Sequence, residues 1–142
     1  MLAYNITIEK TASGFKATCG DFPQLSGVGK DSSAAAQDLK DNIFKQLRLN
    51  ISAKQEIPFP PVVLKRQKMI AFSILIAAKI CLSNSMIRKN MSKMALARQM
   101  KFHLPQVSRL LDLTHTTKIE TLEEALSKLG KRLTVGITAI RD

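Results

Sequence analysis

The sequence predicts an α+β protein in which an N-terminal βββαβ domain, residues 1–72, precedes a helical domain with a C-terminal strand, residues 73–142. Apolar residues alternate at first, as in strands, and later recur every three or four positions, as in helices. The proline-rich stretch 55–61 interrupts the helical pattern. Residues 1–61 carry seven basic and six acidic residues and residues 62–142 fifteen and five, so the net charge rises from +1 to +10. Such asymmetry favours a basic module that binds nucleic acid.

Four short strands are expected in the first domain. Apolar residues alternate with small or polar ones along Leu2–Glu9 and again from Phe15 to Cys19, and the turn residues 11–14 between them indicate a hairpin. Gln24–Val28 is a third, shorter strand, and Lys68–Phe72 is a fourth that returns to the sheet.

Two helices follow from their caps and apolar stripes. Asp31 or Ser32 caps the first, which lies across the sheet on a stripe of Ala36, Leu39, Ile43 and Leu47. Ser73 caps the second, which runs through Ile87. This second helix is apolar on most sides, so we expect it to be buried among several neighbours.

Residues 91–119 predict a helix, a tight turn and another helix, the arrangement of a helix-turn-helix. The first helix runs from about Lys93 to Met100, with Ser92 as its N-cap. The second begins near Leu104, and Pro105 is tolerated there because the first turn of a helix has no use for that N–H.

The second of these helices is amphipathic. Its apolar side holds Leu104, Val107, Leu110 and Leu111, and its polar side holds Pro105, Gln106, Arg109 and Asp112. A short helix that presents Gln and Arg suits the DNA major groove, where Gln pairs with adenine and Arg with guanine. The alternative is an ordinary helical hairpin with a solvated face. The positive charge of the second domain favours DNA.

The end of the chain predicts one more helix and a strand. Thr117 and Glu120 match a capping box, and the helix that follows has an apolar stripe of Ile119, Leu122, Leu126 and Leu129. Gly130 is its expected stop. Leu133–Ile140 is β-rich and apolar, and a lone strand needs a partner. A two-fold related copy could supply one; the alternative is packing on its own domain.

Composition narrows the class of protein. No apolar segment is long enough to cross a membrane, and the N-terminus lacks a signal-peptide pattern. Cys19 and Cys81 have neither metal-ligand spacing nor a disulfide framework, so a reduced cytoplasmic protein is expected.

Two sets of motifs, in this order, resemble one family. The first half has Tyr4, Glu9-Lys10, Gly14-Phe15, Asp21-Phe22-Pro23, Gly27, Gly29, Asp31-Ser32 and Ile57-Pro58-Phe59-Pro60. The second half has Leu96-Ala97-Arg98, Gln106-Val107-Ser108-Arg109-Leu110, Thr116-Thr117-Lys118-Ile119 and Lys128-Leu129-Gly130. Together they resemble HicB-type antitoxins of the helix-turn-helix subtype.

The chain departs from the pattern of that family at three places. It has Ser33-Ala34-Ala35 where an acidic pair is common, Lys101 where glycine is usual, and His103 where Ser or Thr is usual. A positive φ at Lys101 would be strained.

The resemblance implies that the first domain is a partial ribonuclease H-like fold that binds a HicA-type ribonuclease toxin. It also implies that the second domain represses the protein's own operon.

Because ribonuclease H-like folds can be enzymes, catalysis by the first domain has to be considered. Two-metal hydrolysis needs several carboxylates that converge on the metal ions. The acidic residues of the first half, Glu9, Asp21, Asp31, Asp38, Asp41 and Glu56, fall mostly on loops or an exposed helix face. We therefore expect no catalysis, metal or cofactor. His103 and His115 lack catalytic partners and are interpreted as cap or loop residues.

The leading hypothesis is a non-enzymatic antitoxin that neutralises a HicA-type mRNA-cleaving toxin, binds palindromic operator DNA as a dimer and represses its own transcription. Base readers are predicted to be Gln106 and Arg109, with Leu104 and Pro105 near a thymine methyl. The predicted phosphate contacts are Ser92, Lys93, His103, Thr116 and Lys118. The toxin-binding residues within 1–72 stay open. The alternative is a helix-turn-helix repressor whose N-terminal domain senses a small ligand.

Overall fold

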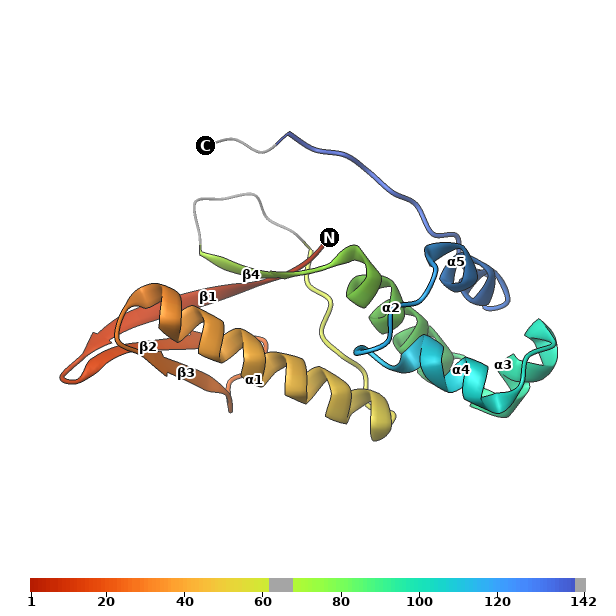
Figure 1. Cartoon of the computed structure of the whole chain (residues 1–142), viewed down its shortest axis with the longest axis horizontal. Coiled ribbons are helices and arrows are strands. Elements are labelled where there is room, and N and C mark those ends of the chain that lie inside the picture. Colours follow the sequence, from red (N-terminus) through yellow and green to blue (C-terminus); the bar gives the residue numbers. More distant parts are fainter. Residues whose placement is uncertain (62–67, 140–142) are drawn as a thin grey trace.

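The computed structural model describes residues 1–61 and 68–139. The molecule is elongated, with an antiparallel sheet and its covering helix at one end and four shorter helices at the other (Figure 1). The mixed α+β prediction is confirmed. Within the described residues, no helix is both long and apolar enough to span a bilayer.

The sheet contains four strands in the order β3-β2-β1-β4. The strands are β1 (Leu2–Thr11), β2 (Gly14–Cys19), β3 (Ser26–Gly29) and β4 (Met69–Phe72). All neighbours are antiparallel, and the returning strand β4 pairs with β1 as predicted. The third strand begins two residues later than expected, because Leu25 still closes a turn by donating its N–H to the Phe22 carbonyl at 3.0 Å.

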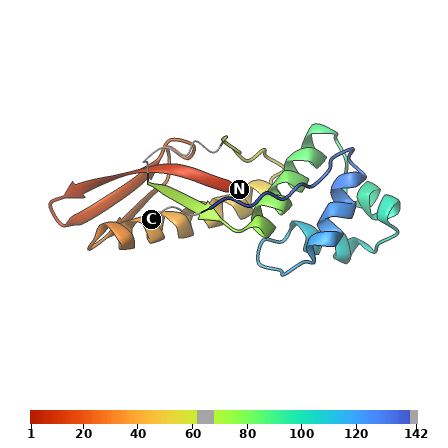
Figure 2. The same ribbon diagram turned by 90° about the horizontal axis from the view of Figure 1, so that it is seen from above.

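Helix α1 (Ser32–Ser52) covers one face of this sheet (Figure 2). Asp31 caps it by accepting the Ala34 N–H at 2.7 Å, which decides between the two predicted caps. The buried stripe is Ala35, Leu39, Ile43 and Leu47, so Ala35 replaces the predicted Ala36, which is half-buried.

The glycines of β3 explain that shift. A Cβ on Gly27 would lie 2.2 Å from the Leu39 nitrogen and 2.4 Å from the Ala35 oxygen, so strand and helix meet backbone to backbone. Helix α1 also covers the outer edge of β3, because Asp38 accepts the Val28 N–H at 2.9 Å and Asn42 donates to the Ser26 carbonyl at 2.8 Å.

The other end of the molecule is helical. Its elements are α2 (Ile74–Arg88), α3 (Lys93–Met100), α4 (Leu104–Leu111) and α5 (Ile119–Ser127). Ser73 and Ser92 cap α2 and α3 as predicted, by accepting the Ile76 and Ala95 N–H groups at 3.2 and 3.1 Å.

Helix α2 joins the two ends, because it contributes to two hydrophobic clusters. Its residues Ala77 and Ile80 belong to the cluster beneath the sheet, whereas Ala78, Leu82 and Met86 belong to the cluster among α2–α5. The Asn84 side chain donates to the Ile57 carbonyl and accepts the Ile57 N–H, both at 2.9 Å, and both residues are buried. The predicted boundary after Phe72 therefore falls just before a helix that packs on both sides.

At the end of the chain, one prediction is wrong, and the predicted strand is not formed in the single chain. The Thr117–Glu120 capping box does not form: Lys118 is the N-cap of α5, and the Thr117 hydroxyl instead lies 3.5 Å from the Arg109 carbonyl and 3.2 Å from His115 Nδ1. Residues 131–139 form neither helix nor strand, because no neighbouring strand lies beside them in the single chain. Val135 and Ile137 are 66% and 97% exposed, so this segment does not pack on its own domain beyond Leu133. Ile140 lies outside the described residues.

Candidate nucleic-acid interface

The turn between α3 and α4 is tight. Lys101 has φ 57° and ψ 41°, the left-handed conformation considered from the sequence, and Phe102 then donates its N–H to the Ala97 carbonyl at 2.8 Å. A non-glycine residue in this region costs on the order of 1 kcal/mol. His103 is the N-cap of α4, as predicted, and its exposed ring forms no cap hydrogen bond.

Helix α4 buries one side and exposes the other. Val107, Leu110 and Leu111 enter the helical core, while Pro105 and Arg109 are exposed. Leu104 is 45% exposed, so this predicted member of the apolar side lies at its margin. The guanidinium of Arg109 makes no hydrogen bond within the described part of the chain and is free to reach a partner.

Gln106 is held differently from Arg109. It is half-buried, and its Oε1 accepts the His103 N–H at 2.7 Å, one half of a capping box. The carboxamide oxygen is thus occupied in the free protein. The Nε2 group retains its two N–H donors.

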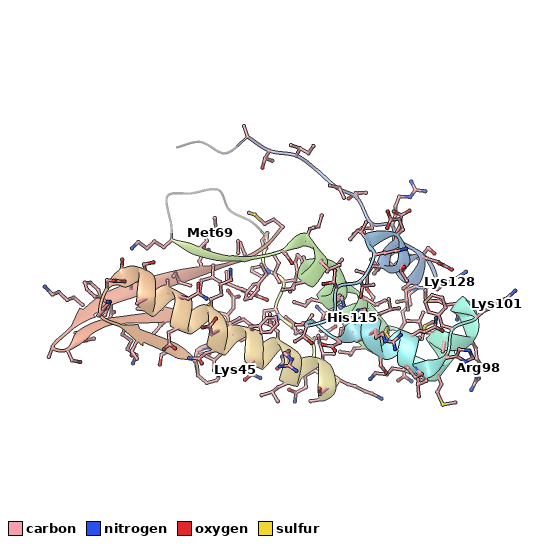
Figure 3. The ribbon with its side chains drawn as sticks, viewed as in Figure 1. Lys45, Met69, Arg98, Lys101, His115 and Lys128 are labelled. Carbon is pink, nitrogen blue, oxygen red and sulfur yellow. The ribbon has the colours of Figure 1, made fainter. Side chains whose placement is uncertain are left out.

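The five predicted phosphate contacts are all exposed but do not form one cluster. Ser92 and Lys93 begin α3, and His103 begins α4. Thr116 and Lys118 lie past the other end of α4, which is about 12 Å long at 1.5 Å per residue. His103 therefore lies at the start of α4 and Thr116 and Lys118 lie beyond its end, whereas Lys93 lines a pocket together with Ser108 and Asp112 of the second half of α4. Arg98 and Lys101 lie at the end of the molecule farthest from the sheet (Figure 3).

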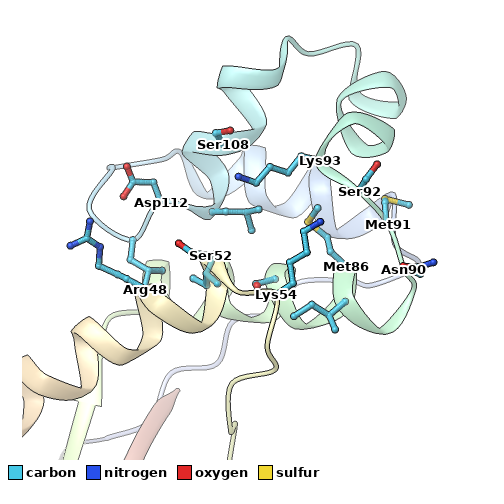
Figure 4. A pocket seen from close by; sticks show the side chains of 15 residues that line it. Arg48, Ser52, Lys54, Met86, Asn90, Met91, Ser92, Lys93, Ser108 and Asp112 are labelled. Atoms are coloured by element: carbon cyan, nitrogen blue, oxygen red, sulfur yellow. The ribbon is translucent and has the colours of Figure 1, made fainter.

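A pocket of about 530 Å³ adjoins α4 and lies between the end of α1, the end of α2 and the start of α3 (Figure 4). Arg48 from the last turns of α1 and Lys54, two residues past that helix, face Lys93 and Asp112 across it. The sequence did not indicate that α1 cations would approach the start of α3, because this juxtaposition depends on how α1 packs against the helical end.

Asp112 ends α4 and shapes the loop that follows. Its carboxylate accepts the Thr114 hydroxyl at 2.6 Å and the Thr114 N–H at 2.9 Å. These hydrogen bonds, with smaller contributions from Lys79 and Arg48, hold the pKa of Asp112 below its ordinary range. Leu113 turns inward and is buried in the cluster beneath the sheet.

Lys79 was missed as part of this region. Its amine is fully buried and donates to the carbonyls of Arg109, Asp112 and His115 at 2.9, 2.7 and 2.7 Å. Burial lowers the pKa of Lys79, and Asp112 partly opposes that shift. The sequence contained one sign of this role, because Lys79 interrupts the apolar first half of α2.

The acidic and histidine residues do not converge. Within residues 1–61 and 68–139, no three His, Cys, Asp or Glu side chains are placed to hold a metal ion together. The features that stand out are instead an exposed arginine on a short amphipathic helix, a hydroxyl-rich loop and several lysines. Such a surface suits recognition of an anionic partner.

Comparison with known proteins places this chain in a family. The family model described as HicB_like antitoxin of bacterial toxin-antitoxin system matches residues 3–81, more than half of the chain. The protein therefore belongs to the HicB-like antitoxins, as the sequence motifs predicted, and a toxin is the kind of partner that this family implies.

Curated relatives extend the similarity over nearly the whole length. Antitoxin HicB of Pseudomonas fluorescens (strain Pf0-1) is 27% identical over 140 residues, which cover 98% of this chain and 96% of the relative. Antitoxin HicB 2 of Photorhabdus laumondii is 28% identical over 132 residues, covering 93% and 94%. Antitoxin HicB of Escherichia coli (strain K12) is 24% identical over 135 residues, covering 94% and 98%.

Proposed function

We propose that this protein neutralises a HicA-type mRNA-cleaving ribonuclease toxin by direct contact and represses transcription of its own operon by binding operator DNA. Family membership supports the toxin partner. The observation that carries the DNA-binding part is the amphipathic α4, which buries Val107 and Leu110 and leaves Arg109 exposed, within a half of net charge +10.

In this proposal α3 and α4 are a helix-turn-helix unit, with α4 in the major groove. Arg109 and Gln106 read base edges, while Leu104 and Pro105 contact a thymine methyl. Ser92, Lys93, His103, Thr116 and Lys118 contact the phosphates on either side. The exposure of all five, with His103 at the start of α4 and Thr116 and Lys118 beyond its end, supports this division between base and backbone contacts.

We assign toxin binding to residues 1–72, the partial ribonuclease H-like domain, and DNA binding and dimerisation to residues 73–142. A basic RNA-cleaving toxin prefers the less basic half, because like charges oppose docking. The chain acts in the cytoplasm as a non-enzymatic protein. It needs no metal or cofactor to bind either partner.

A homodimer follows from the exposed tail. Val135 and Ile137 project from a segment that has no partner strand within the described part of this chain. Pairing with the same segment of a second copy would bury them across a two-fold axis and place two α4 helices on a palindromic operator.

A second candidate function is a repressor that senses a small ligand. The pocket beside α4 favours it, because a ligand there would touch Arg48 of α1 and Lys54 just past that helix, together with Lys93 of α3. Its volume of about 530 Å³ falls within the range of small-molecule sites. A neighbouring reading frame that encodes a short basic protein with a histidine-bearing motif would support the antitoxin instead.

The test compares two substitutions on operator DNA. Arg109→Ala should cost about 1–3 kcal/mol and relax preference at one base pair of each half-site. Lys118→Ala should weaken binding to every sequence and lower the salt slope by about 1 per half-site. Lys45→Ala on α1 removes the same charge away from α4 and serves as the control (Figure 3).

Gel shifts at several salt concentrations and an RNA-cleavage inhibition assay measure both activities. Arg109→Ala should leave toxin inhibition intact. Equal losses on operator and unrelated DNA from both substitutions would show that Arg109 is not a base reader. Failure of the wild type to inhibit the ribonuclease encoded beside it would favour the ligand-sensing alternative.

A further inference from the structure

Lys79 is the only charged side chain that is buried within residues 1–61 and 68–139. It lies in the middle of α2, and its amine donates to the carbonyls of Arg109, Asp112 and His115 at 2.7–2.9 Å. An ammonium group has three N–H donors, so all of them are used. Burying an ammonium is costly unless it is fully hydrogen-bonded, and this arrangement satisfies that requirement.

The three carbonyls belong to the end of α4 and the loop beyond it. Arg109 is in the last turn of α4, Asp112 is its C-cap and His115 lies three residues further on. The final carbonyls of a helix lack partners inside the helix and carry partial negative charge, which a cation stabilises. Asp112 has an extended backbone rather than the left-handed C-cap common at helix ends. The Asp112 N–H donates to the Arg109 carbonyl at 3.3 Å, and the amine adds a second, shorter hydrogen bond to the same carbonyl.

The same loop carries two of the predicted phosphate contacts. Thr116 and Lys118 are exposed, whereas their neighbour Thr117 points back toward the Arg109 carbonyl. On the inner side, the loop is anchored by Leu113 in the core and by the bonds from Lys79. Lys79 and the loop residues are more than 30 positions apart, so only the tertiary fold brings them together.

We propose that Lys79 is a positioning residue for DNA binding. By joining the end of α4 to the 112–118 loop, it sets where Lys118 and Thr116 meet the phosphate backbone while Arg109 lies in the groove. This inference rests on the proposed DNA-binding function. Lys79 itself is buried and touches no DNA.

The test is a double-mutant cycle between Lys79→Gln and Lys118→Ala. Glutamine retains two N–H donors but is shorter and uncharged. Lys79→Gln should lower operator affinity about tenfold, and Lys118→Ala should then cost less than about twofold, because coupled pairs are not additive. Lys89→Gln, the same change at an exposed position at the end of α2, is the matched control and should be additive with Lys118→Ala.

Two further measurements separate positioning from general stability. Toxin inhibition by Lys79→Gln should equal that of the wild type, whereas amide hydrogen exchange at residues 112–118 should be faster. In the wild type, the Lys79 ammonium protons should exchange slowly enough to give a nitrogen-correlated NMR signal at neutral pH, unlike those of exposed lysines. This last measurement needs no variant to fold.

The outcomes that contradict the proposal are distinct from those that contradict the function. Additive effects of Lys79→Gln and Lys118→Ala, or parallel losses of operator binding and toxin inhibition, would overturn the positioning role alone. So would a Lys79 ammonium that exchanges as fast as those of exposed lysines. If the wild type binds no operator fragment, the proposed DNA-binding function fails first, and this inference with it.

Discussion

The hydrogen bonds between Asn84 and Ile57 should be among the most important polar contacts for stability. The Asn84 carboxamide serves both the N–H and the carbonyl of Ile57 at 2.9 Å, and the two residues are 4% and 2% exposed. Asn84→Ala removes the hydrogen-bond partner of both the N–H and the carbonyl of Ile57, and little water can reach this buried site to replace it. A buried backbone group left without a partner costs about 1–3 kcal/mol, so the N–H and the carbonyl of Ile57 together should cost about 2–6 kcal/mol.

Urea unfolding followed by circular dichroism measures this loss. With a slope of about 2 kcal/mol/M, in the middle of the usual range, the midpoint should fall by about 1–3 M. Asn50→Ala is the control, because Asn50 donates to the Glu56 carbonyl of the same segment in a long, exposed hydrogen bond of 3.4 Å. It should cost less than about 1 kcal/mol. A loss of under about 0.5 kcal/mol for Asn84→Ala would refute the reasoning that the two ends of the molecule depend on this contact.

Three other outcomes are expected. Lys101→Gly should raise the free energy of unfolding by up to about 1 kcal/mol in the same urea assay, because glycine adopts φ 57° without strain; a destabilised variant would contradict this. Deleting residues 134–142 should convert dimer to monomer in sedimentation and weaken operator binding, whereas a truncated dimer would place the interface on the helices. Because the pKa of Asp112 is lowered in the fold, its contribution to stability should be present at neutral pH and disappear as pH falls through that lowered pKa. Asp112→Asn should therefore reduce the loss in free energy of unfolding that occurs as the pH falls. An unchanged dependence on pH in the acid range would show that the carboxylate contributes nothing.

Much of the fold was predictable because it depends on local patterns. The caps Asp31, Ser73 and Ser92 are short-range features of sequence, and each was anticipated. The buried stripe of α1 begins at Ala35 and not at the predicted Ala36, because Gly27 allows the helix backbone to pack directly against β3. The capping box at Thr117 failed because its hydroxyl turns toward Arg109 and His115. Both differences arise from tertiary contacts that periodicity does not describe.

The candidate site was predictable only in part. The bounds of α3 and the start of α4 follow from caps and spacing, whereas the left-handed conformation of Lys101 was considered only because related sequences usually have glycine there. The carbonyl partners of Lys79 and the approach of Arg48 to α4 join residues far apart in the chain. The roles of individual residues toward DNA stay predictions.

The cap that Gln106 provides has a consequence for the operator. Its Oε1 accepts the His103 N–H, so reading adenine with both ends of the carboxamide requires either breaking that cap or a second hydrogen bond to the same oxygen in the orientation that the cap imposes. While the cap persists, the Nε2 donors are the groups without a partner, and adenine N7, guanine N7 or O6, and thymine O4 all accept a hydrogen bond from them. We therefore expect operator half-sites to be degenerate opposite Gln106 and selective opposite Arg109. An alignment of half-sites chosen from random DNA would show one weak column beside a strong guanine.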